Sequence, residues 1–312
     1  MQTKPQDSSV KSIQSVQTLS VIVPVFNEES TIGIILKKVT RLKNLKEVIV
    51  VDDGSKDSTP QRVEELGLPK VRLIKQEKNL GKTAAVRRGL QEVTGDITIF
   101  QDADLEYDPD EIEHVIQPIV ENKADIVYGS RFLVKRATRV LYFYHYIANK
   151  MLTLFSNFLT NVNMSDIETC YKAFRTPLIK NLPLRSSGFG MEVEITALAT
   201  KTKARIYEVP ISYYGRTYEE GKKIKLTDGL IALWYIAYYN LISYISPSRK
   251  KYIEKANVFL TQWKREGVKE DGIKSDIDYS KLSSLKLADS TPSTLEISQC
   301  EQTKDIHNPS GK

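Results

Sequence analysis

Residues 19–53 read LSVIVPVFNEESTIGIILKKVTRLKNLKEVIVVDD, and this stretch decides the fold. It begins with an apolar, β-branched run at Leu19–Val25 and ends with a similar run at Glu47–Val51. Between the two runs, apolar residues recur at the spacing of one helix face: Ile32, Ile35, Leu36 and Val39. The order strand, helix, strand predicts a βαβ unit whose two strands run parallel.

The same alternation continues along the chain. We expect further strands at Val71–Gln76, Asp96–Phe100 and Ala124–Tyr128, and helices at Gln61–Leu66, Thr83–Glu92 and Glu111–Glu121. This pattern predicts an α/β fold with a mostly parallel sheet flanked by helices. In such sheets, ligands bind beyond the carboxyl ends of the strands, which is where the polar clusters FNEE, DDGS and DAD fall.

Composition excludes several classes of protein. The chain has 312 residues, a formal net charge of +6 and two cysteines, Cys170 and Cys300. This length can bury a substantial core without disulfides, and two distant cysteines exclude a disulfide scaffold or a Cys-rich zinc module. The moderate excess of positive charge favours anionic substrates or a membrane surface over nucleic acid as a partner.

Both ends of the chain are polar. Residues 1–18 are rich in Ser and Gln and lack the apolar run of a signal peptide, so we expect a disordered segment and a cytoplasmic protein. Residues 266–312 are rich in Ser, Thr, Lys and Asp, and we expect a second disordered segment there.

The acidic segment after DITIF is the clearest candidate for chemistry. Asp102 and Asp104 follow this strand, and Glu106 stands two positions further on. Alternate side chains of an extended chain point the same way, so these carboxylates can converge on one cation. Mg²⁺ or Mn²⁺ is usually held beside a diphosphate by such carboxylates and phosphate oxygens. We therefore predict a divalent metal site here, with a solvated acidic loop as the alternative.

Other polar residues at the same edge suit a nucleotide. Asp53 follows the strand EVIVV and can accept hydrogen bonds from a base or ribose, although an Asx turn with a helix cap is the alternative. Phe26 and Glu28 follow the first strand. Lys82 precedes a helix and can stabilise a phosphate, its alternative being a solvated lysine.

Two apolar, aromatic-rich stretches come later, at Val140–Val162 and Gly229–Ile245. The second falls short of the ~20 apolar residues of a spanning helix. Basic residues flank both stretches: Lys135, Arg136, Arg139, Arg249, Lys250 and Lys251. Trp and Tyr with basic flanks favour helices lying in a membrane interface, while a buried core helix or a dimer face is the alternative.

Six motifs now occur in order: SVIVPVFNEES, VIVVDDGSKDST, NLGKTAAVRRG, DADLEYDP, YGSRF and EVPISYYGRTYEEGKKI. Together, over about residues 19–240, they resemble family 2 glycosyltransferases of the Rossmann-like GT-A fold. Within that family they look most like polyprenyl-phosphate (dolichyl-phosphate) hexose synthases. The resemblance implies a nucleotide-sugar donor, Mg²⁺ or Mn²⁺, and inversion at the anomeric carbon. We accordingly expect a GT-A domain at residues 19–225 and amphipathic, interfacial helices at residues 226–265.

The resemblance also implies roles for individual residues. Asp102, Asp104 and Glu106 would hold the metal and the diphosphate, and Asp104 would act in catalysis. Arg131 in YGSRF would contact phosphate and also act in catalysis. The nucleotide-sugar pocket would be lined by Pro24, Phe26, Glu28, Val51, Asp53, Lys82, Asp102, Ala103, Arg216 and Lys222 or its neighbour Lys223.

One segment departs from the pattern of dolichyl-phosphate mannose synthases. Asp166 matches the Asp of their Asp-x-x-Ser-Gly-Phe-Arg motif, but residues 169–172 read TCYK here. Position 106 is Glu where those enzymes often have Gln. A hydroxyl acceptor would require a base, for which Asp166 and Glu168 are the candidates; a structural carboxylate is the alternative for Glu168.

The leading hypothesis is a metal-dependent inverting hexosyltransferase that moves a hexose from UDP-glucose or GDP-mannose to a polyprenyl phosphate. Its partners would include a membrane surface, to which it would bind peripherally, and a second copy in a homodimer. In the second hypothesis, the acceptor is instead a hydroxyl of a lipid-linked or polymeric glycan. A third is a nucleotide-sugar-binding protein without turnover.

Overall fold

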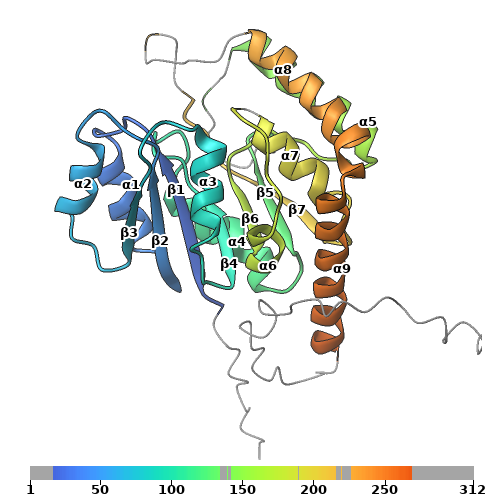
Figure 1. The fold of residues 1–312 in the computed structure, drawn as a ribbon, viewed down its shortest axis with the longest axis horizontal. Coiled ribbons are helices and arrows are strands. Elements are labelled where there is room, and N and C mark those ends of the chain that lie inside the picture. Colours follow the sequence, from blue (N-terminus) through green and yellow to red (C-terminus); the bar gives the residue numbers. More distant parts are fainter. Residues whose placement is uncertain are drawn as a thin grey trace, which may run out of the picture. The chain divides into compact units, whose positions relative to one another are not determined.

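The computed structural model describes residues 17–133, 139, 142–188, 190–215, 219 and 226–268. These residues form one seven-stranded sheet in the order β3-β2-β1-β4-β6-β5-β7 (Figure 1). The strands are β1 (Leu19–Val25), β2 (Leu45–Asp52), β3 (Val71–Lys75), β4 (Ile97–Phe100), β5 (Ile126–Ser130), β6 (Lys172–Arg175) and β7 (Ile206–Pro210).

The sheet is mostly parallel, as expected from the sequence. Strand β1 pairs in parallel with β2 and β4, β2 with β3, and β5 with β7. Only β6, among the described strands, runs antiparallel to both its neighbours, β4 and β5. Because β6 is reversed, the residues that precede it lie at the same edge as the carboxyl ends of β1, β2 and β4.

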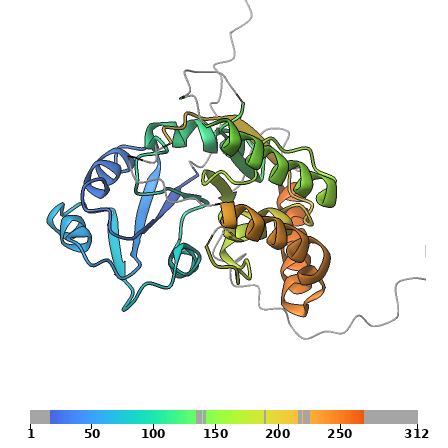
Figure 2. The ribbon, with the colours of Figure 1, turned by 90° about the horizontal axis from the view of Figure 1, so that it is seen from above.

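Helices cover both faces of the sheet. Figure 2 shows α3 on one face and α1 and α4 on the other. The elements of this half are α1 (Ile32–Val39), α2 (Thr59–Glu65), α3 (Lys82–Leu90), the 3₁₀ turn η1 (Pro109–Glu111) and α4 (Ile112–Val120). All seven residues of β1 are buried, which explains its unbroken apolar sequence. The strands and helices predicted up to residue 130 are confirmed, with boundaries within two residues.

The second half contains α5 (Phe143–Thr160), α6 (Thr176–Lys180) and α7 (Gly190–Ala199), followed by α8 (Leu226–Ala237). A π-helical turn, η2 (Tyr238–Ile242), and a 3₁₀ turn, η3 (Ser243–Ile245), separate α8 from α9 (Pro247–Val268). The apolar stretch 229–245 is therefore not one regular helix. Buried Asn240 lies in the π-helical turn and donates from its Nδ2 to the carbonyl of Ile236 (2.9 Å).

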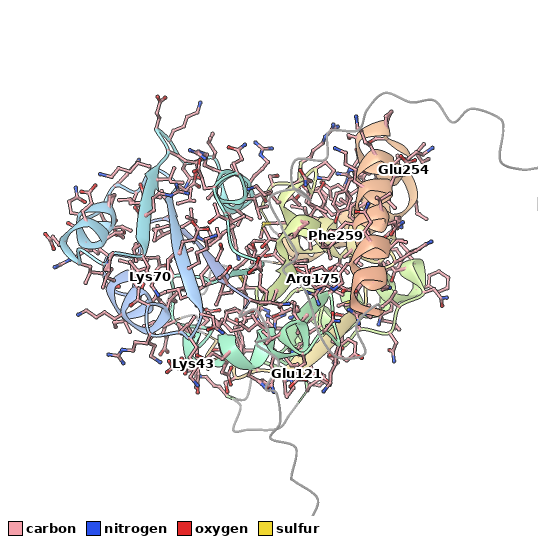
Figure 3. The ribbon with its side chains drawn as sticks, turned by 90° about the horizontal axis from the view of Figure 1, so that it is seen from below. Lys43, Lys70, Glu121, Arg175, Glu254 and Phe259 are labelled. Carbon is pink, nitrogen blue, oxygen red and sulfur yellow. The ribbon has the colours of Figure 1, made fainter. Side chains whose placement is uncertain are left out.

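Helix α9 packs on the body of the fold. Its buried residues are Tyr252, Ala256, Phe259, Leu260 and Trp263. The guanidinium of Arg175, on β6, lies 4.2 Å from the centre of the Trp263 ring. Figure 3 labels Arg175 and, on α9, Phe259. Trp263 also donates from Nε1 to Oδ1 of Asn122 (3.0 Å). One face of α9 thus belongs to the core, while the interfacial role expected for residues 226–265 stays a prediction.

Arg249 corrects an expectation about the basic residues after Pro247. We expected it to face anionic lipid headgroups, but it is 1% exposed and pairs with Glu194 of α7. Its guanidinium also lies 4.7 Å from the centre of the Tyr239 ring. A guanidinium buried between a carboxylate and an aromatic ring is a packing element. Lys250 and Lys251, next to it, are exposed.

No helix in the described ranges combines the length and the apolar character needed to cross a bilayer.

Candidate active site

The loop after β2 fixes the backbone in front of α3. Asp53 is buried, and its Oδ1 accepts hydrogen bonds from the backbone N–H of Leu80 (2.8 Å) and from Nε2 of Gln76 (2.7 Å). Its Oδ2 accepts from the N–H of Gly81 (2.7 Å). Both oxygens of Asp53 are therefore engaged in holding the turn that leads into Lys82.

Its neighbours Asp52 and Gly54 complete this turn. Gly54 has a φ of 72°, and a Cβ there would lie 2.7 Å from the carbonyl carbon of Lys78, so the close approach requires glycine. Asp52 is buried; its Oδ2 accepts from the N–H of Ser55 (3.2 Å), whereas its Oδ1 has no hydrogen-bond partner among the described residues. Since a buried acceptor without a partner is costly, Asp52 is better placed than Asp53 to receive a donor group of a nucleotide.

The Lys82 side chain joins this loop to the acidic segment after β4. Its Nζ lies 2.8 Å from Oδ1 and 3.1 Å from Oδ2 of Asp102. It also lies 3.2 Å from Sγ of Cys170 and 3.5 Å from Oε1 of Glu192. Burial lowers the pKa of Lys82, but Asp102, Cys170 and Glu192 outweigh this effect and raise it well above its ordinary value. Lys82 is therefore a cation bound to the first acid of the DAD motif.

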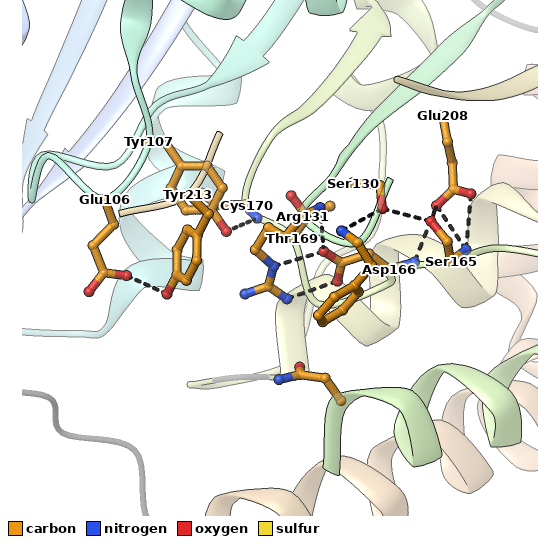
Figure 4. Close-up of polar contacts among 12 residues, drawn as sticks. Glu106, Tyr107, Ser130, Arg131, Ser165, Asp166, Thr169, Cys170, Glu208 and Tyr213 are labelled. Carbon is orange, nitrogen blue, oxygen red and sulfur yellow. Dashed lines mark hydrogen bonds and ion pairs between the residues drawn. The ribbon is translucent and has the colours of Figure 1, made fainter. Parts of the chain in front are cut away.

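Beyond Asp102 the loop turns sharply. Leu105 adopts a φ of 64°, the left-handed region that side chains other than glycine rarely occupy. The turn lets Oδ1 of Asp104 accept from the N–H of Glu106 (3.2 Å). It also directs the Glu106 carboxylate to Tyr213, whose hydroxyl donates to Oε2 (2.7 Å; Figure 4).

Three tyrosine rings in tilted contact support this loop. The ring centre of Tyr107 lies 4.9 Å from that of Tyr171 and 5.3 Å from that of Tyr213. The hydroxyl of Tyr107 accepts from the N–H of Cys170 (3.1 Å). The rings thus join the acidic loop to the residues before β6 and after β7.

Arg131 is held by Asp166 (Figure 4). Its Nε lies 2.7 Å from Oδ2 and its Nη2 2.8 Å from Oδ1 of Asp166, and its backbone N–H also donates to Oδ2 (3.1 Å). Burial raises the pKa of Asp166, but Arg131 outweighs this effect and lowers it below its usual range. This arrangement disfavours Asp166 as a base and makes it a positioning residue for Arg131.

A second carboxylate positions the Asp166 loop. Oε1 of Glu208, on β7, accepts from the Ser165 hydroxyl (2.9 Å) and from the N–H of Asp166 (3.2 Å). Ser165 also shares a hydrogen bond with the Ser130 hydroxyl at the end of β5 (2.6 Å). The orientation of Arg131 therefore depends on contacts from several strands, as Figure 4 shows.

Two more carboxylates, those of Glu168 and Glu192, act on each other near this site. Burial, together with the charge of Glu192, raises the pKa of Glu168 to about 8. Oε1 of Glu168 is buried without a hydrogen-bond partner among the described residues. Lys172 is buried beside them and donates to the carbonyl of Thr169, and burial lowers its pKa. Glu168 is thus the candidate base, because one of its carboxylate oxygens accepts no hydrogen bond from a described residue, whereas both oxygens of Asp166 bind Arg131.

The remaining predicted residues lie around the same edge or outside the described residues. Pro24 and Val51 pair across β1 and β2 and are buried, as is Ala103. Phe26 is exposed at the end of β1, and the Glu28 carboxylate accepts from the Thr31 hydroxyl (3.0 Å). Three residues lie outside the described ranges: Arg216, Lys222 and Lys223.

The donor set fits a hard divalent cation. Asp102 and Asp104 supply carboxylate oxygens at a strand end, and Mg²⁺ is commonly held by one or two carboxylates together with substrate phosphates. Within the described part of the chain, no three Asp, Glu, His or Cys side chains are already gathered as a metal site. Asp102 is bound to Lys82, and Glu106 to Tyr213.

Several residues of this site were missed in the sequence. Glu192 lies in the first turn of α7, whose residues are all buried and therefore give no periodic pattern. Tyr213 and Glu208 come from β7 and the loop after it, elements that we did not predict. Glu208 and Tyr213 reach the site because β7 pairs in parallel with β5, a neighbour relation that only the sheet order reveals.

Comparison with known proteins gives one consistent family. The sequence model described as "Glycosyl transferase family 2" matches residues 20–182. A dolichol-phosphate mannosyltransferase of Pyrococcus furiosus is 30% identical over 209 residues, which are 65% of this chain and 58% of that protein. A UDP-N-acetylglucosamine–dolichyl-phosphate N-acetylglucosaminyltransferase of Methanococcus voltae is 31% identical, over 61% of this chain and 83% of that protein.

A third relative and a solved structure agree. The polyprenol monophosphomannose synthase of Mycolicibacterium smegmatis is 26% identical, over 66% of this chain and 80% of that protein. Glucosyl-3-phosphoglycerate synthase of Mycobacterium tuberculosis, solved with Mn²⁺, uridine diphosphate and phosphoglyceric acid, has a TM-score of 0.56 and 22% identity, over 72% of this chain and 79% of that chain. At this identity the structural likeness shows a shared GT-A fold.

Proposed function

Because this chain belongs to glycosyl transferase family 2, we propose that it moves a hexose from a nucleotide sugar to a polyprenyl phosphate, with a divalent metal and inversion at the anomeric carbon. The observation that carries the proposal is the meeting of Asp102, Lys82 and a clamped Arg131 at one edge of the sheet, beside the apolar helix α5. The relatives named for dolichyl or polyprenyl phosphate support this acceptor class. Because they differ in the sugar, the hexose is left open.

The leaving group is a nucleoside diphosphate, so departure places negative charge beside the acidic loop. Asp102 and Asp104 would hold the metal, which neutralises that charge when bound. Lys82 supplies a further cation at the start of α3. Fixed positive groups at the position where charge develops are the largest contribution to catalysis in many enzymes.

The nucleophile requires orientation more than activation. A phosphomonoester carries roughly −1.5 to −2 charges at pH 7, so its oxygen attacks without a base. Asp166 binds Nε and Nη2 of Arg131 and leaves Nη1 without a hydrogen bond among the described residues. Lys150 of α5 lies next to it, with Nζ 4.4 Å from the centre of the Phe132 ring and 3.4 Å from the carbonyl of Ser165. These two cations are our candidates for holding the acceptor phosphate in line.

Helix α5 supports a lipid acceptor, because it exposes a row of apolar side chains to solvent. Its buried residues are Leu152, Thr153 and Ser156, whereas its exposed ones recur on one face: Tyr144, Ile147, Met151, Leu154 and Phe158. Helix α8 packs beside it and exposes Leu230, Ile231 and Trp234 (Figure 1). Contiguous exposed apolar surface rimmed by aromatic residues is typical of proteins that bind a membrane interface.

The test supplies the purified protein with vesicles containing polyprenyl phosphate, Mn²⁺ and a panel of labelled donors: UDP-glucose, UDP-N-acetylglucosamine and GDP-mannose. We expect label in the organic phase, released again by mild acid. The matched control is polyprenol, which lacks the phosphate and should remain unlabelled. Label that appears only in polyprenol or in a water-soluble glycan would contradict the phosphate acceptor.

Asp104→Ala tests the proposed role of the acidic segment in holding the metal. Loss of a carboxylate at the reacting diphosphate should lower transfer by roughly a hundredfold or more, while the protein remains folded. Circular dichroism and the labelling assay measure the two effects. Full activity in this variant would refute the metal assignment.

A hydroxyl acceptor is the second candidate, and Glu168 favours it. Its unpartnered Oε1 and its pKa of about 8 suit a general base. Glu168→Gln distinguishes the two reactions: transfer to a phosphate should survive, whereas transfer to a hydroxyl should fall by roughly a hundredfold or more.

A further inference from the structure

The first acid of the DAD motif is occupied by a cation of the protein itself. Nζ of Lys82 lies within hydrogen-bond distance of both oxygens of Asp102, at 2.8 and 3.1 Å. The carboxylate therefore presents both oxygens to the lysine. A divalent ion that uses Asp102 must displace Lys82 or share the carboxylate with it, and two positive charges a few ångströms apart repel each other.

The backbone under Lys82 is fixed, so only its side chain can move away. Asp53 holds the N–H groups of Leu80 and Gly81, and Gly54 packs against the backbone of the same loop. The Lys82 side chain is 31% exposed, and among the described residues its Nζ hydrogen-bonds to side chains, those of Asp102 and Cys170, and to no backbone carbonyl. It can therefore rotate toward a ligand at the loop while α3 stays in place.

We propose that Lys82 is a built-in competitor for the metal, which holds Asp102 until a nucleoside diphosphate arrives and then binds that diphosphate. The incoming diphosphate offers Lys82 a new anion and at the same time brings oxygens for the metal. Metal and nucleotide therefore bind together, and the metal alone binds weakly. The inference rests on the proposed function for the identity of the nucleotide, but not for the competition at Asp102.

The test measures the binding of Mn²⁺ without nucleotide, from the loss of the electron paramagnetic resonance signal of the free ion. Lys82→Met keeps an unbranched side chain one atom shorter and removes its charge. We expect this variant to bind Mn²⁺ about tenfold or more tightly than the natural chain, because a like charge beside the site is gone. Lys46→Met is the matched control: Lys46 is exposed and bonds to the carbonyl of Thr94, and its substitution should leave the affinity unchanged.

The combined variant Lys82→Met, Asp102→Asn should lose the gain, which locates the ion at Asp102. Adding UDP or GDP should tighten Mn²⁺ binding strongly in the natural chain and much less in Lys82→Met. Equal or weaker Mn²⁺ binding by Lys82→Met alone overturns the inference, as does a gain that persists without Asp102. Lys82→Gln repeats the measurement if the methionine variant is poorly folded. Failure of sugar transfer would contradict the proposed function and leave the Mn²⁺ comparison intact.

Discussion

At the scale of single residues, the Arg131–Asp166 pair determines the geometry of the candidate phosphate site. Their side chains are 10% and 0% exposed, so neither charge is well solvated. We predict that Asp166→Asn destabilises the fold by about 3–5 kcal/mol, because it leaves a buried guanidinium without its counter-charge. Urea denaturation measures the change. A loss below about 1 kcal/mol would mean that Arg131 finds another carboxylate.

Glu168 gives a prediction about pH. Its pKa is about 8 in the folded chain against 4.5 for an ordinary glutamate, so between these values the folded state binds a proton that the unfolded state has lost. Stability should therefore fall as pH rises through this window, by at most about 1.4 kcal/mol per pH unit from this group. Glu168→Gln should flatten that part of the curve. Unfolding free energies at pH 5, 6, 7 and 8 test this, and an unchanged slope would contradict it.

Glu192 provides the matched variant for the same measurement. Its charge contributes to the raised pKa of Glu168, so Glu192→Gln should move the pKa of Glu168 down toward its ordinary value. The fall in stability should then end at a lower pH, and be smaller in total, than in the natural chain. An unchanged pH dependence in this variant would contradict the contribution of Glu192 to the raised pKa of Glu168.

At the scale of elements, the sequence indicates the first half of the fold because its strands are apolar runs bounded by polar turns. Strand β6 escapes prediction because it has only four residues, including buried Lys172 and Arg175. Helix α7 escapes because it is buried all round. In both, tertiary contacts rather than local pattern determine the structure.

Helix α9 contributes a buried face to the core, which the sequence did not indicate. Its Trp263 combines a cation–π contact to Arg175 with a hydrogen bond to Asn122. We predict that Trp263→Ala costs about 3–5 kcal/mol, the usual range for a large buried aromatic residue. Val258→Ala, at an exposed position of the same helix, should stay within about 0.5 kcal/mol. Similar losses in the two variants would show that α9 does not contribute to the core.

At the scale of the whole molecule, the sequence indicates which edge of the sheet carries the chemistry but not how the acids are used. Strand ends place Asp53, Asp102 and Arg131 together because parallel strands share one carboxyl edge. The partners of these residues come from distant segments. Asp53 holds the backbone of a loop, and Asp102 binds Lys82. Both outcomes depend on contacts between elements that no local pattern encodes.

The exposed apolar face of α5 and α8 allows membrane binding to be separated from catalysis. Phe158 is 81% and Trp234 61% exposed, so both side chains lie on the surface of this face. Each apolar side chain that enters the interface contributes about 1.5–3 kcal/mol at full burial. We therefore predict that Phe158→Ser with Trp234→Ser weakens binding to anionic vesicles by about tenfold or more.

Sugar transfer by the same double variant should depend on whether the acceptor lies in a membrane. The double variant should lose activity on long-chain polyprenyl phosphate in vesicles and keep it on a short, water-soluble prenyl phosphate, because the reacting groups are untouched. Val258→Ser on α9 is the control, since it removes an exposed apolar side chain from a helix whose apolar face is buried in the fold. Equal losses on both acceptors would place Phe158 and Trp234 in the folding of the site. Unchanged vesicle binding would show that this face serves another partner, such as a second copy of the chain.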